Sequence, residues 1–202
     1  LRIPSTKVVV TGNLKYDGVA LDRNQPKTIT LRNELGLTQS DWVWVAGSTH
    51  SPEEEICLEV FARLKIRYPK LKLILVPRSQ DRFDEVASMI EKTGRPFTRR
   101  SWKDHVQNVT ASEIILIDTI GELSAVWGLG KVGFTGGSLN KTRGGQSMIE
   151  PAGYGIPVVF GPHTFNFKDA VAGLLECNGA KIIHDADELE SVIEILLTQE
   201  PL

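Results

Sequence analysis

The chain has 202 residues, of which 41% are hydrophobic and 24% charged, and its formal net charge at pH 7 is −2. This length and composition are typical of one soluble globular domain with a full hydrophobic core. The small net charge gives no support for a nucleic-acid partner, and no apolar run approaches the roughly 20 residues that a membrane-spanning helix needs.

Short apolar runs, many of them β-branched and ended by a turn, predict buried strands in chain order. They occupy residues 7–11, 42–46, 71–76, 113–118, 131–135, 157–160 and 181–184. Segments with an apolar period near 3.6 residues predict helices between these strands. They occupy residues 28–35, 52 to at least 64, 82–92, 119–127, 146–152, 165–176 and 186–198. This alternation predicts an α/β fold with a mostly parallel, doubly wound sheet.

Two segments carry more detailed expectations. The second helix is expected to begin with a cap at Ser51, a proline at position 52 and glutamates in the first turn. The polar, basic segment 96–110 is expected to be a variable edge without a function.

Cysteines and short motifs exclude several kinds of site. Cys57 and Cys177 fit no metal-ligand spacing, so we expect buried free thiols in a reducing compartment. The chain has no HExxH motif and no paired Cys/His set, and we therefore expect no metal site. It also has no glycine-rich dinucleotide fingerprint and no P-loop, which weakens the dinucleotide-binding and NTPase hypotheses.

Polar turns follow most of the predicted strands. In a doubly wound sheet, ligands bind at the carboxyl ends of the strands, where these turns lie. Several polar turns on one edge of the sheet therefore predict a binding crevice. The turns are Gly12-Asn13, Ser48-Thr49, Arg78, 119–122 and 136–138.

The stretch 136–167 contains two glycine pairs, Gly136-Gly137 and Gly144-Gly145, followed by the predicted helix 146–152 with a single acid, Glu150. Glycines let a backbone approach a ligand closely, and unpaired N–H groups at a helix start suit a phosphate. Glu150 could accept hydrogen bonds from sugar hydroxyls. The alternative is that the glycines serve only tight turns and that Glu150 caps the helix or faces solvent.

Four other polar residues have two interpretations each. Arg78 could face a ligand, or it could pair at the surface with a nearby aspartate, Asp81 or Asp84. Lys15 could face a ligand or be solvated. His50 and His163 lie on the crevice edge, but an isolated histidine is more often a turn or packing residue than a general base.

Six motifs occur in a fixed order: VTGNLKYD (10–17), AGSTHSPEEE (46–55), LILVPRSQDRFDEV (73–86), LIDTIGEL (116–123), GGSLN (136–140) and GGQSMIEPAGYGIPVVFGPHTFNF (144–167). Together they resemble the carboxyl-terminal, donor-binding domain of the 3-deoxy-D-manno-octulosonic acid (Kdo) transferase family, which acts on lipid A in Gram-negative bacteria. The resemblance covers essentially all of residues 1–202.

The resemblance implies a Rossmann-like half of a GT-B glycosyltransferase that binds CMP-Kdo. The family inverts the anomeric centre without a metal or other cofactor, and its catalytic base lies in an amino-terminal domain. That domain also meets the lipid A precursor, at the cytoplasmic face of the inner membrane. The abrupt start of the chain is expected of a domain from a longer protein, so we expect this soluble fragment to bind donor but to be inactive alone.

The resemblance also assigns roles to individual residues. It implies that Gly145, Gln146 and Ser147 present the helix start to the CMP phosphate and that Glu150 binds ribose. Arg78 would offset charge on the phosphate or the Kdo carboxylate, which gives it a catalytic role in leaving-group departure. Further donor contacts are expected from Lys15 at the cleft edge, Ser48 and Thr49 in the pocket, Ile120, Gly121, Glu122 and Leu123 beside the cytosine, and Gly136, Gly137 and Ser138.

One position departs from the family pattern. The family usually has Asn where this chain has Ser147, and the shorter side chain changes the reach of a donor contact. Two other hypotheses stay open. One is a GT-B enzyme that uses a UDP-sugar, such as an epimerase or a MurG-like transferase, and the other is a non-catalytic nucleotide-binding module.

Overall fold

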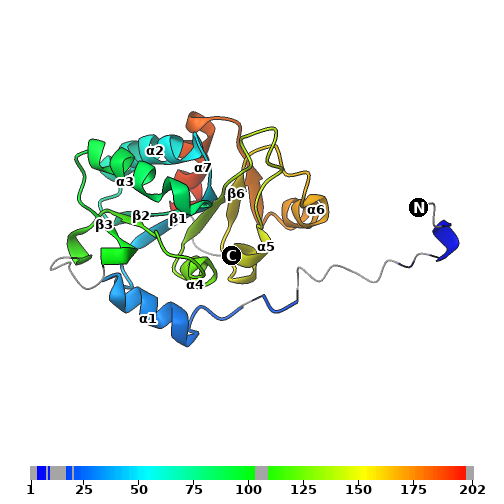
Figure 1. The fold of residues 1–202 in the computed structure, drawn as a ribbon, viewed down its shortest axis with the longest axis horizontal. Coiled ribbons are helices and arrows are strands. Elements are labelled where there is room, and N and C mark those ends of the chain that lie inside the picture. Colours follow the sequence, from blue (N-terminus) through cyan, green and yellow to red (C-terminus); the bar gives the residue numbers. More distant parts are fainter. Residues whose placement is uncertain (1–3, 8, 10–16, 20, 103–108, 199–202) are drawn as a thin grey trace.

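The computed structural model describes residues 4–7, 9, 17–19, 21–102 and 109–198. These residues form one seven-stranded sheet with helices on both faces (Figure 1). The strands lie in the order β3-β4-β2-β1-β5-β6-β7, and all neighbouring strands are parallel. The predicted parallel, doubly wound α/β sheet is therefore confirmed. The strands are β1 (Trp42–Thr49), β2 (Leu71–Pro77), β3 (Phe97–Arg99), β4 (Ile114–Leu116), β5 (Val132–Thr135), β6 (Val158–Phe160) and β7 (Ala180–Ile182).

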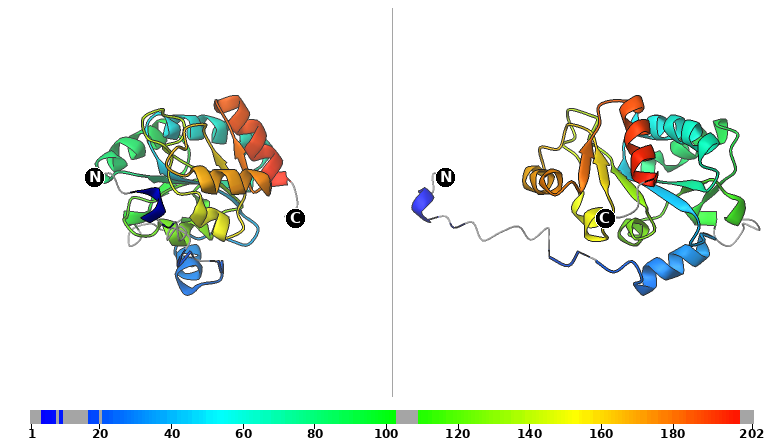
Figure 2. Two further views of the ribbon diagram at one scale, coloured as in Figure 1. Left: turned by 90° about the vertical axis from the view of Figure 1, so that its right-hand side faces the viewer. Right: turned by 180° about the vertical axis from the view of Figure 1, so that it is seen from behind.

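The helices form two layers. Helices α2, α3 and α7 cover one face of the sheet, α1, α4 and α5 cover the other, and α6 lies beside the β6–β7 end (Figures 1 and 2). Their bounds are α1 (Pro26–Glu34), α2 (Glu53–Arg67), α3 (Phe83–Lys92), α4 (Leu123–Trp127), α5 (Ile149–Gly153), α6 (Lys168–Glu176) and α7 (Ala186–Thr198). No helix among the described residues is long and apolar enough to cross a membrane.

The core is divided by the sheet, and strand β1 shows how. Its side chains alternate between the two faces, as the period of two in a strand requires. Trp44 and Ala46 belong to the apolar cluster under α2, α3 and α7. Val43 and Val45 belong to the cluster under α1 and α4. Both faces of the strand are therefore buried, which explains why its sequence is an unbroken apolar run.

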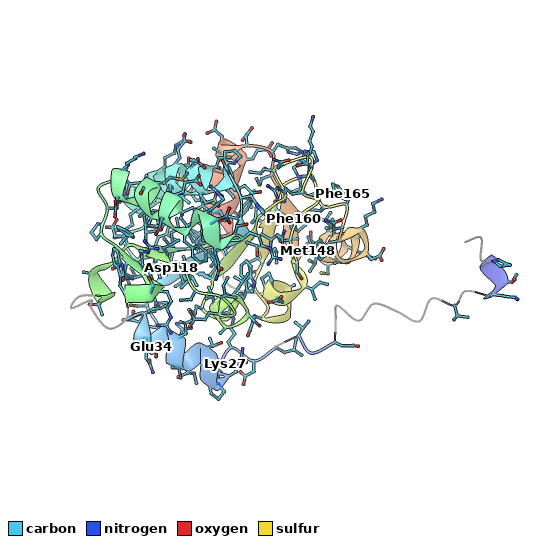
Figure 3. All side chains as sticks on the ribbon, viewed as in Figure 1. Lys27, Glu34, Asp118, Met148, Phe160 and Phe165 are labelled. Atoms are coloured by element: carbon cyan, nitrogen blue, oxygen red, sulfur yellow. The ribbon has the colours of Figure 1, made fainter. Side chains whose placement is uncertain are left out.

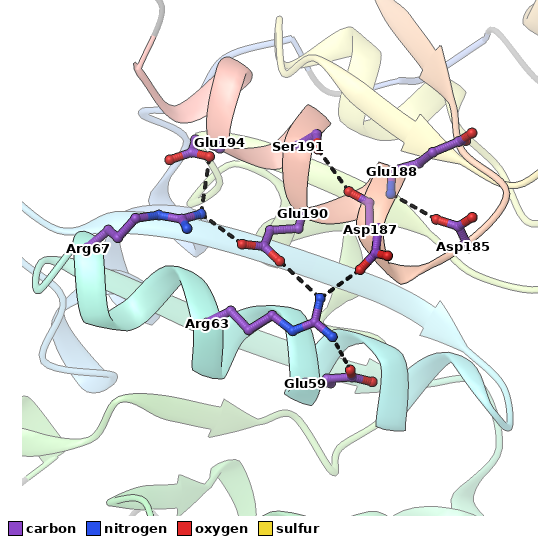
Figure 4. Close-up of polar contacts among 9 residues, drawn as sticks. All are labelled: Glu59, Arg63, Arg67, Asp185, Asp187, Glu188, Glu190, Ser191 and Glu194. Atoms are coloured by element: carbon purple, nitrogen blue, oxygen red, sulfur yellow. Dashed lines mark hydrogen bonds and ion pairs between the residues drawn. The ribbon is translucent and has the colours of Figure 1, made fainter.

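Helix α7 docks on α2 through arginines as well as through apolar contacts (Figure 4). Arg63 donates to Asp187 at 2.8 Å and to Glu190 at 3.1 Å, and it also pairs with Glu59. Arg67 donates to Glu190 at 2.8 Å and to Glu194 at 3.1 Å. These pairs are largely exposed, so each contributes little stability, but the carboxylate of Glu190, which both arginines share, helps to fix the register of the two helices.

The strand predicted at 7–11 is wrong for the residues of that run that the structure describes. Lys7 ends a 3-10 helix, Ser5–Lys7, and Val9 is 81% exposed. Strand β1 is paired on both sides, with β2 and β5, so the centre of the sheet is filled without this run. Residues 8 and 10–16 lie outside the described residues.

A short edge strand was missed in segment 96–110. Phe97–Arg99 forms β3 and pairs with β4, and it is the first strand in the sheet order. Its three residues include Thr98 and Arg99, so it has no apolar run by which a buried strand is recognised. The description of this segment as an edge is nevertheless right.

Several helix starts differ from the predictions, and α4 and α6 begin four and three residues later than expected, at Leu123 and Lys168. Helix α2 begins at Glu53, and no side-chain cap bond forms at its start, so the expected cap by Ser51 is wrong. Helix α5 begins at Ile149, three residues later than predicted, because the backbone leaves the positive-φ pair Gly144-Gly145 in an extended loop. The two thiols also differ, since Cys57 is buried as expected whereas Cys177 is exposed.

Gly47 in β1 generates a stability prediction. A Cβ atom at this position would lie 2.4 Å from Cζ2 of the buried Trp127 ring. Gly47→Ala should therefore lower the free energy of unfolding by about 1–3 kcal/mol, measured by urea denaturation. Gly173→Ala is the matched control, because α6 offers nothing within 4 Å of the new methyl group. This control should raise stability by up to about 1 kcal/mol. Equal transition midpoints for both variants would contradict the packing shown for Gly47.

Candidate functional site

Three strand ends meet at one edge of the sheet. Strand β1 lies between β2 and β5, so the turns after these strands are neighbours. The amide of Gly136 donates to the Gly47 carbonyl at 2.9 Å, and the amide of Arg78 donates to the Thr49 carbonyl at 3.0 Å. Four of the predicted site residues are therefore brought together here: Ser48, Thr49, Arg78 and Gly136.

The carboxylate of Glu53 organises this edge. Glu53 is 1% exposed, and its Oε2 accepts hydrogen bonds from the amides of His50 at 3.0 Å and Gly137 at 2.7 Å. Its Oε1 accepts from the amides of Ser138 at 2.9 Å and Leu139 at 3.1 Å. Burial raises the pKa of Glu53, and the four N–H donors act in the opposite direction by favouring the carboxylate. One side chain thus joins the loop after β1 to the loop after β5.

These bonds change the roles that Gly137 and Ser138 can have. Their amides point to Glu53 inside the protein and are not available to a ligand. The Ser138 hydroxyl is also engaged, since it donates to the Thr135 carbonyl at 2.7 Å and accepts from the Gly161 amide at 2.8 Å. Both residues therefore shape the loop from within.

Gly136 is a glycine because the two loops approach so closely. A Cβ atom there would lie 2.4 Å from the Ser48 carbonyl oxygen and 2.7 Å from Glu53 Oε2. Ser48 itself adopts φ +54°, in a bulge that shifts the register between β1 and β2. The edge is therefore tightly packed and locally strained.

Three side chains face Gly137, and two of them, His50 and Arg143, were not predicted as ligand contacts. A Cβ atom at Gly137 would lie 3.3 Å from Cδ2 of His50, and 3.5 Å from both Cβ of Arg143 and Cγ of Gln146. His50 is 7% exposed and its Nε2 has no hydrogen-bond partner. Burial lowers the pKa of His50, and the charges of three nearby arginines lower it further: Arg143, Arg82 and Arg78. The position of Arg143 directly before a glycine pair was the signal in the sequence that could have indicated it.

The three arginines near His50 differ in whether they have an ion-pair partner. Arg82 pairs with the buried Glu54 at 2.7 Å and with Glu85 at 2.9 Å. Arg78 and Arg143 are exposed, and neither makes an ion pair within the described part of the chain. The alternative prediction, a surface ion pair between Arg78 and Asp84, is not seen, because Asp84 pairs with Arg99 at 2.8 Å. The edge therefore presents two unneutralised guanidinium groups.

The second glycine loop lies against the first. The Gly145 amide donates to the Gly137 carbonyl at 2.8 Å, which places Gln146 beside the same edge. Among the described residues, the amides of Gln146 and Ser147 have no backbone acceptor. Met148, which precedes α5, lies with Phe160 in a buried apolar cluster, and the exposed Phe165 lies close to the Gly144 position (Figure 3).

Glu150 lies in the first turn of α5 and is half-buried. Burial raises its pKa, and no hydrogen bond or ion pair offsets this effect among the described residues. A carboxylate held in this way is available to accept hydrogen bonds from hydroxyl groups of a ligand.

The loop 119–123 reaches the same edge on the side of α4. Leu123 Cδ1 would lie 3.0 Å from a Cβ atom at Gly47, which places this residue beside the end of β1. Ile120 is 65% exposed. The Glu122 carboxylate binds Thr119 and also Arg100 at 3.0 Å, and Arg100 is in turn paired with Glu34. Glu122 is therefore held within the protein, whereas Ile120 is open to a ligand.

The expected place of Lys15 and the expected absence of a metal site both stay predictions. Lys15 lies outside the described residues. Among the described residues, no group of three or more His, Cys, Asp or Glu side chains could hold a metal ion. His163 is partly buried, and its amide donates to the Ser138 carbonyl at 3.0 Å.

Known proteins resemble this chain along its whole length. No family model matches it. The chain is 39% identical over 202 residues to a 3-deoxy-D-manno-octulosonic acid transferase of Haemophilus influenzae, which covers 99% of the chain and 46% of that relative. A transferase with the same name from Bordetella pertussis is 33% identical over 180 residues, covering 88% of the chain and 41% of the relative. The chain thus spans about half the length of the curated relatives it matches.

Solved structures also resemble this chain. The crystal structure of the C-terminal CMP-Kdo binding domain of WaaA from Acinetobacter baumannii matches with a TM-score of 0.73 and 34% identity, covering 85% of this chain and 86% of that one. HepE of Anabaena, solved with UDP and glucose, matches with a TM-score of 0.60 at 17% identity, covering 87% and 44% of the two chains. The second likeness concerns the fold alone, and the sheet is that of a Rossmann-like half of a GT-B glycosyltransferase.

The Glu53 bonds generate a second stability prediction. Glu53→Gln replaces one acceptor oxygen by an NH₂ group that would face buried N–H donors, so the free energy of unfolding should fall by about 2–4 kcal/mol. The control is Glu55→Gln, because Glu55 is exposed in the same first turn of α2 and should be neutral within about 0.5 kcal/mol. Urea denaturation measures both, and a fully stable Glu53→Gln variant would refute the anchoring role.

Proposed function

This chain belongs to the 3-deoxy-D-manno-octulosonic acid transferase family, and we propose that it is the carboxyl-terminal domain that binds CMP-Kdo in such a glycosyltransferase. The observation that carries the proposal is the likeness to the Acinetobacter CMP-Kdo binding domain, at 34% identity over 85% of this chain. Two unneutralised arginines at the strand ends support it, because the donor is an anion.

In this proposal CMP lies across the carboxyl ends of the strands. The amides of Gln146 and Ser147 bind the phosphate, which is also contacted by Arg78. Glu150 accepts hydrogen bonds from the ribose hydroxyls, and the exposed Ile120 packs against the cytosine. The remaining contacts line the cleft: Lys15 at its edge, and Ser48, Thr49, Gly121, Leu123, Gly136 and Gly145 in its wall.

The proposed reaction is a direct displacement at the anomeric carbon of Kdo. A hydroxyl oxygen of the acceptor bonds to this carbon while the bond from the carbon to the CMP phosphate oxygen breaks. A carboxylate in the amino-terminal half takes the hydroxyl proton, and the configuration inverts without a metal. Negative charge grows on the departing phosphate, and Arg78 stabilises this charge.

The acceptor and the location belong to the whole protein. We propose that the complete enzyme works at the cytoplasmic face of the inner membrane on a lipid A precursor. The amino-terminal half would hold this acceptor and contact the membrane. The 202-residue chain should therefore bind the donor without transferring Kdo.

Nucleotide selectivity tests the proposal against its alternatives. Calorimetric titration of the chain should show binding of CMP and CMP-Kdo, and weaker or undetectable binding of UDP and UDP-sugars. Tighter binding of UDP would favour a UDP-sugar-dependent GT-B enzyme. If the full-length enzyme is active but binds CMP-Kdo no more tightly than CMP, a different CMP-linked donor would be favoured.

Glu150 provides a residue-level test. Glu150→Ala should weaken CMP binding by about 10- to 100-fold, because hydrogen bonds from hydroxyl groups to a carboxylate are lost. The control is Glu176→Ala at the exposed end of α6, which should leave the affinity unchanged. An unchanged affinity of the Glu150→Ala variant would remove Glu150 from the site.

The same variant should not be less stable. The pKa of Glu150 is raised in the native chain, so the native state holds this proton more tightly than the unfolded state. Ionisation of Glu150 therefore lowers the free energy of unfolding as the pH rises from about 4.3, its ordinary pKa, through the raised native pKa. At pH 7 the Ala variant lacks this unfavourable contribution, and its urea midpoint should equal or exceed that of the wild type.

A further inference from the structure

A corner of the site formed by His50, Gly137, Arg143 and Gln146 is not used by the contacts assigned so far to the nucleotide, apart from the Gln146 amide. We call it the His50–Arg143 corner. Its three side chains come from two separate loops and converge on the one residue that has no side chain, Gly137. This inference rests on the proposed function, and it concerns which part of the donor the corner binds.

Three side chains from the two loops close in on Gly137. The position that a Cβ atom would occupy is 3.3 Å from the His50 ring, 3.5 Å from Arg143 Cβ and 3.5 Å from Gln146 Cγ. Gly137 has φ +66°, a conformation that favours glycine, and a side chain there would crowd these three neighbours. Because Glu53 binds the Gly137 amide, polar contacts in the corner must come from the surrounding side chains.

The corner has excess positive charge because nearby carboxylates are already engaged. Glu53 accepts four amide hydrogen bonds, and Glu54 binds Arg82. Arg143 and Arg78 have no ion-pair partner among the described residues, yet both are close enough to His50 to lower its pKa. The pKa of the imidazole is therefore held below its ordinary value, and its buried Nε2 has no hydrogen-bond partner among the described residues. This nitrogen is available to a ligand group.

The donor has two separate negative charges, one on the phosphodiester and one on the carboxylate of its sugar. A single arginine cannot make bidentate contacts with both groups, whereas two arginines near His50 can. Arg78 follows β2 and is assigned to the phosphate. We propose that Arg143 binds the carboxylate of the donor's acidic sugar, with His50 and Gln146 as its polar neighbours in the His50–Arg143 corner.

This assignment makes the corner a determinant of sugar specificity. A guanidinium group matches a carboxylate in shape and charge, so an acidic sugar gains a charge-assisted pair. A neutral sugar in the same place would leave the His50 nitrogen and the arginine charge unmatched. The domain then selects the donor twice, once by its nucleotide and once by its sugar acid.

The test compares CMP with CMP-Kdo on the 202-residue chain. Arg143→Gln should weaken CMP-Kdo binding by about tenfold or more, as expected for loss of a hydrogen-bonded charge pair. CMP, which lacks the sugar carboxylate, should bind within about twofold of its wild-type affinity. Arg143→Lys keeps the charge without the planar fork and should lose less than the Gln variant. Lys141→Gln removes an exposed charge from the same loop and is the matched control.

The outcomes separate this inference from the proposed function. Selective loss of CMP-Kdo affinity in Arg143→Gln, with Lys141→Gln unchanged, supports the carboxylate contact. Equal weakening of CMP and CMP-Kdo would place Arg143 at the phosphate and overturn the inference while the proposed function stands. Unchanged affinities for both ligands would also overturn it. If the wild-type chain binds neither ligand, the proposed function itself fails.

Discussion

The site depends on one buried carboxylate that accepts four amide hydrogen bonds. Glu53 stands at the start of α2, yet three of its four donors belong to the loop after β5, more than eighty residues further along the chain. Water is excluded there, so losing any one of the four hydrogen bonds would leave a buried polar group unpaired. The donors have no alternative acceptor. The shape of the edge therefore follows from satisfying one charge inside the protein.

This anchoring determines where positive charge remains. Acidic side chains that could have neutralised the edge are turned inward: Glu53 to backbone amides, Glu54 to Arg82, and Glu122 to Arg100. Arg78 and Arg143 are left facing outward. A crevice with uncompensated cations attracts anionic ligands and discriminates against neutral ones. The proposed selection of a doubly charged donor would in this sense follow from how the carboxylates are used within the fold.

Much of the fold could be predicted from the sequence because its signals are local. The apolar run of β1 and the inward face of α3 (Phe83, Val86, Ala87 and Ile90) depend only on neighbouring residues. Strand β3 was missed because two of its three residues, Thr98 and Arg99, are polar. The alternation of strands and helices predicted that the turns after β1, β2 and β5 meet at one edge, and the structure confirms this. The contacts of Glu53 could not be predicted, because they join loops far apart in the chain.

The Ser138 hydroxyl joins the end of β5 to the residue after β6, since it donates to Thr135 and accepts from Gly161. Together with Glu53 it links the ends of three neighbouring strands, β1, β5 and β6, before any ligand arrives. Little conformational entropy should then be lost in these walls on association, because they were ordered when the chain folded. The site should consequently be preorganised for binding, and the enthalpy of association should come mainly from new polar contacts.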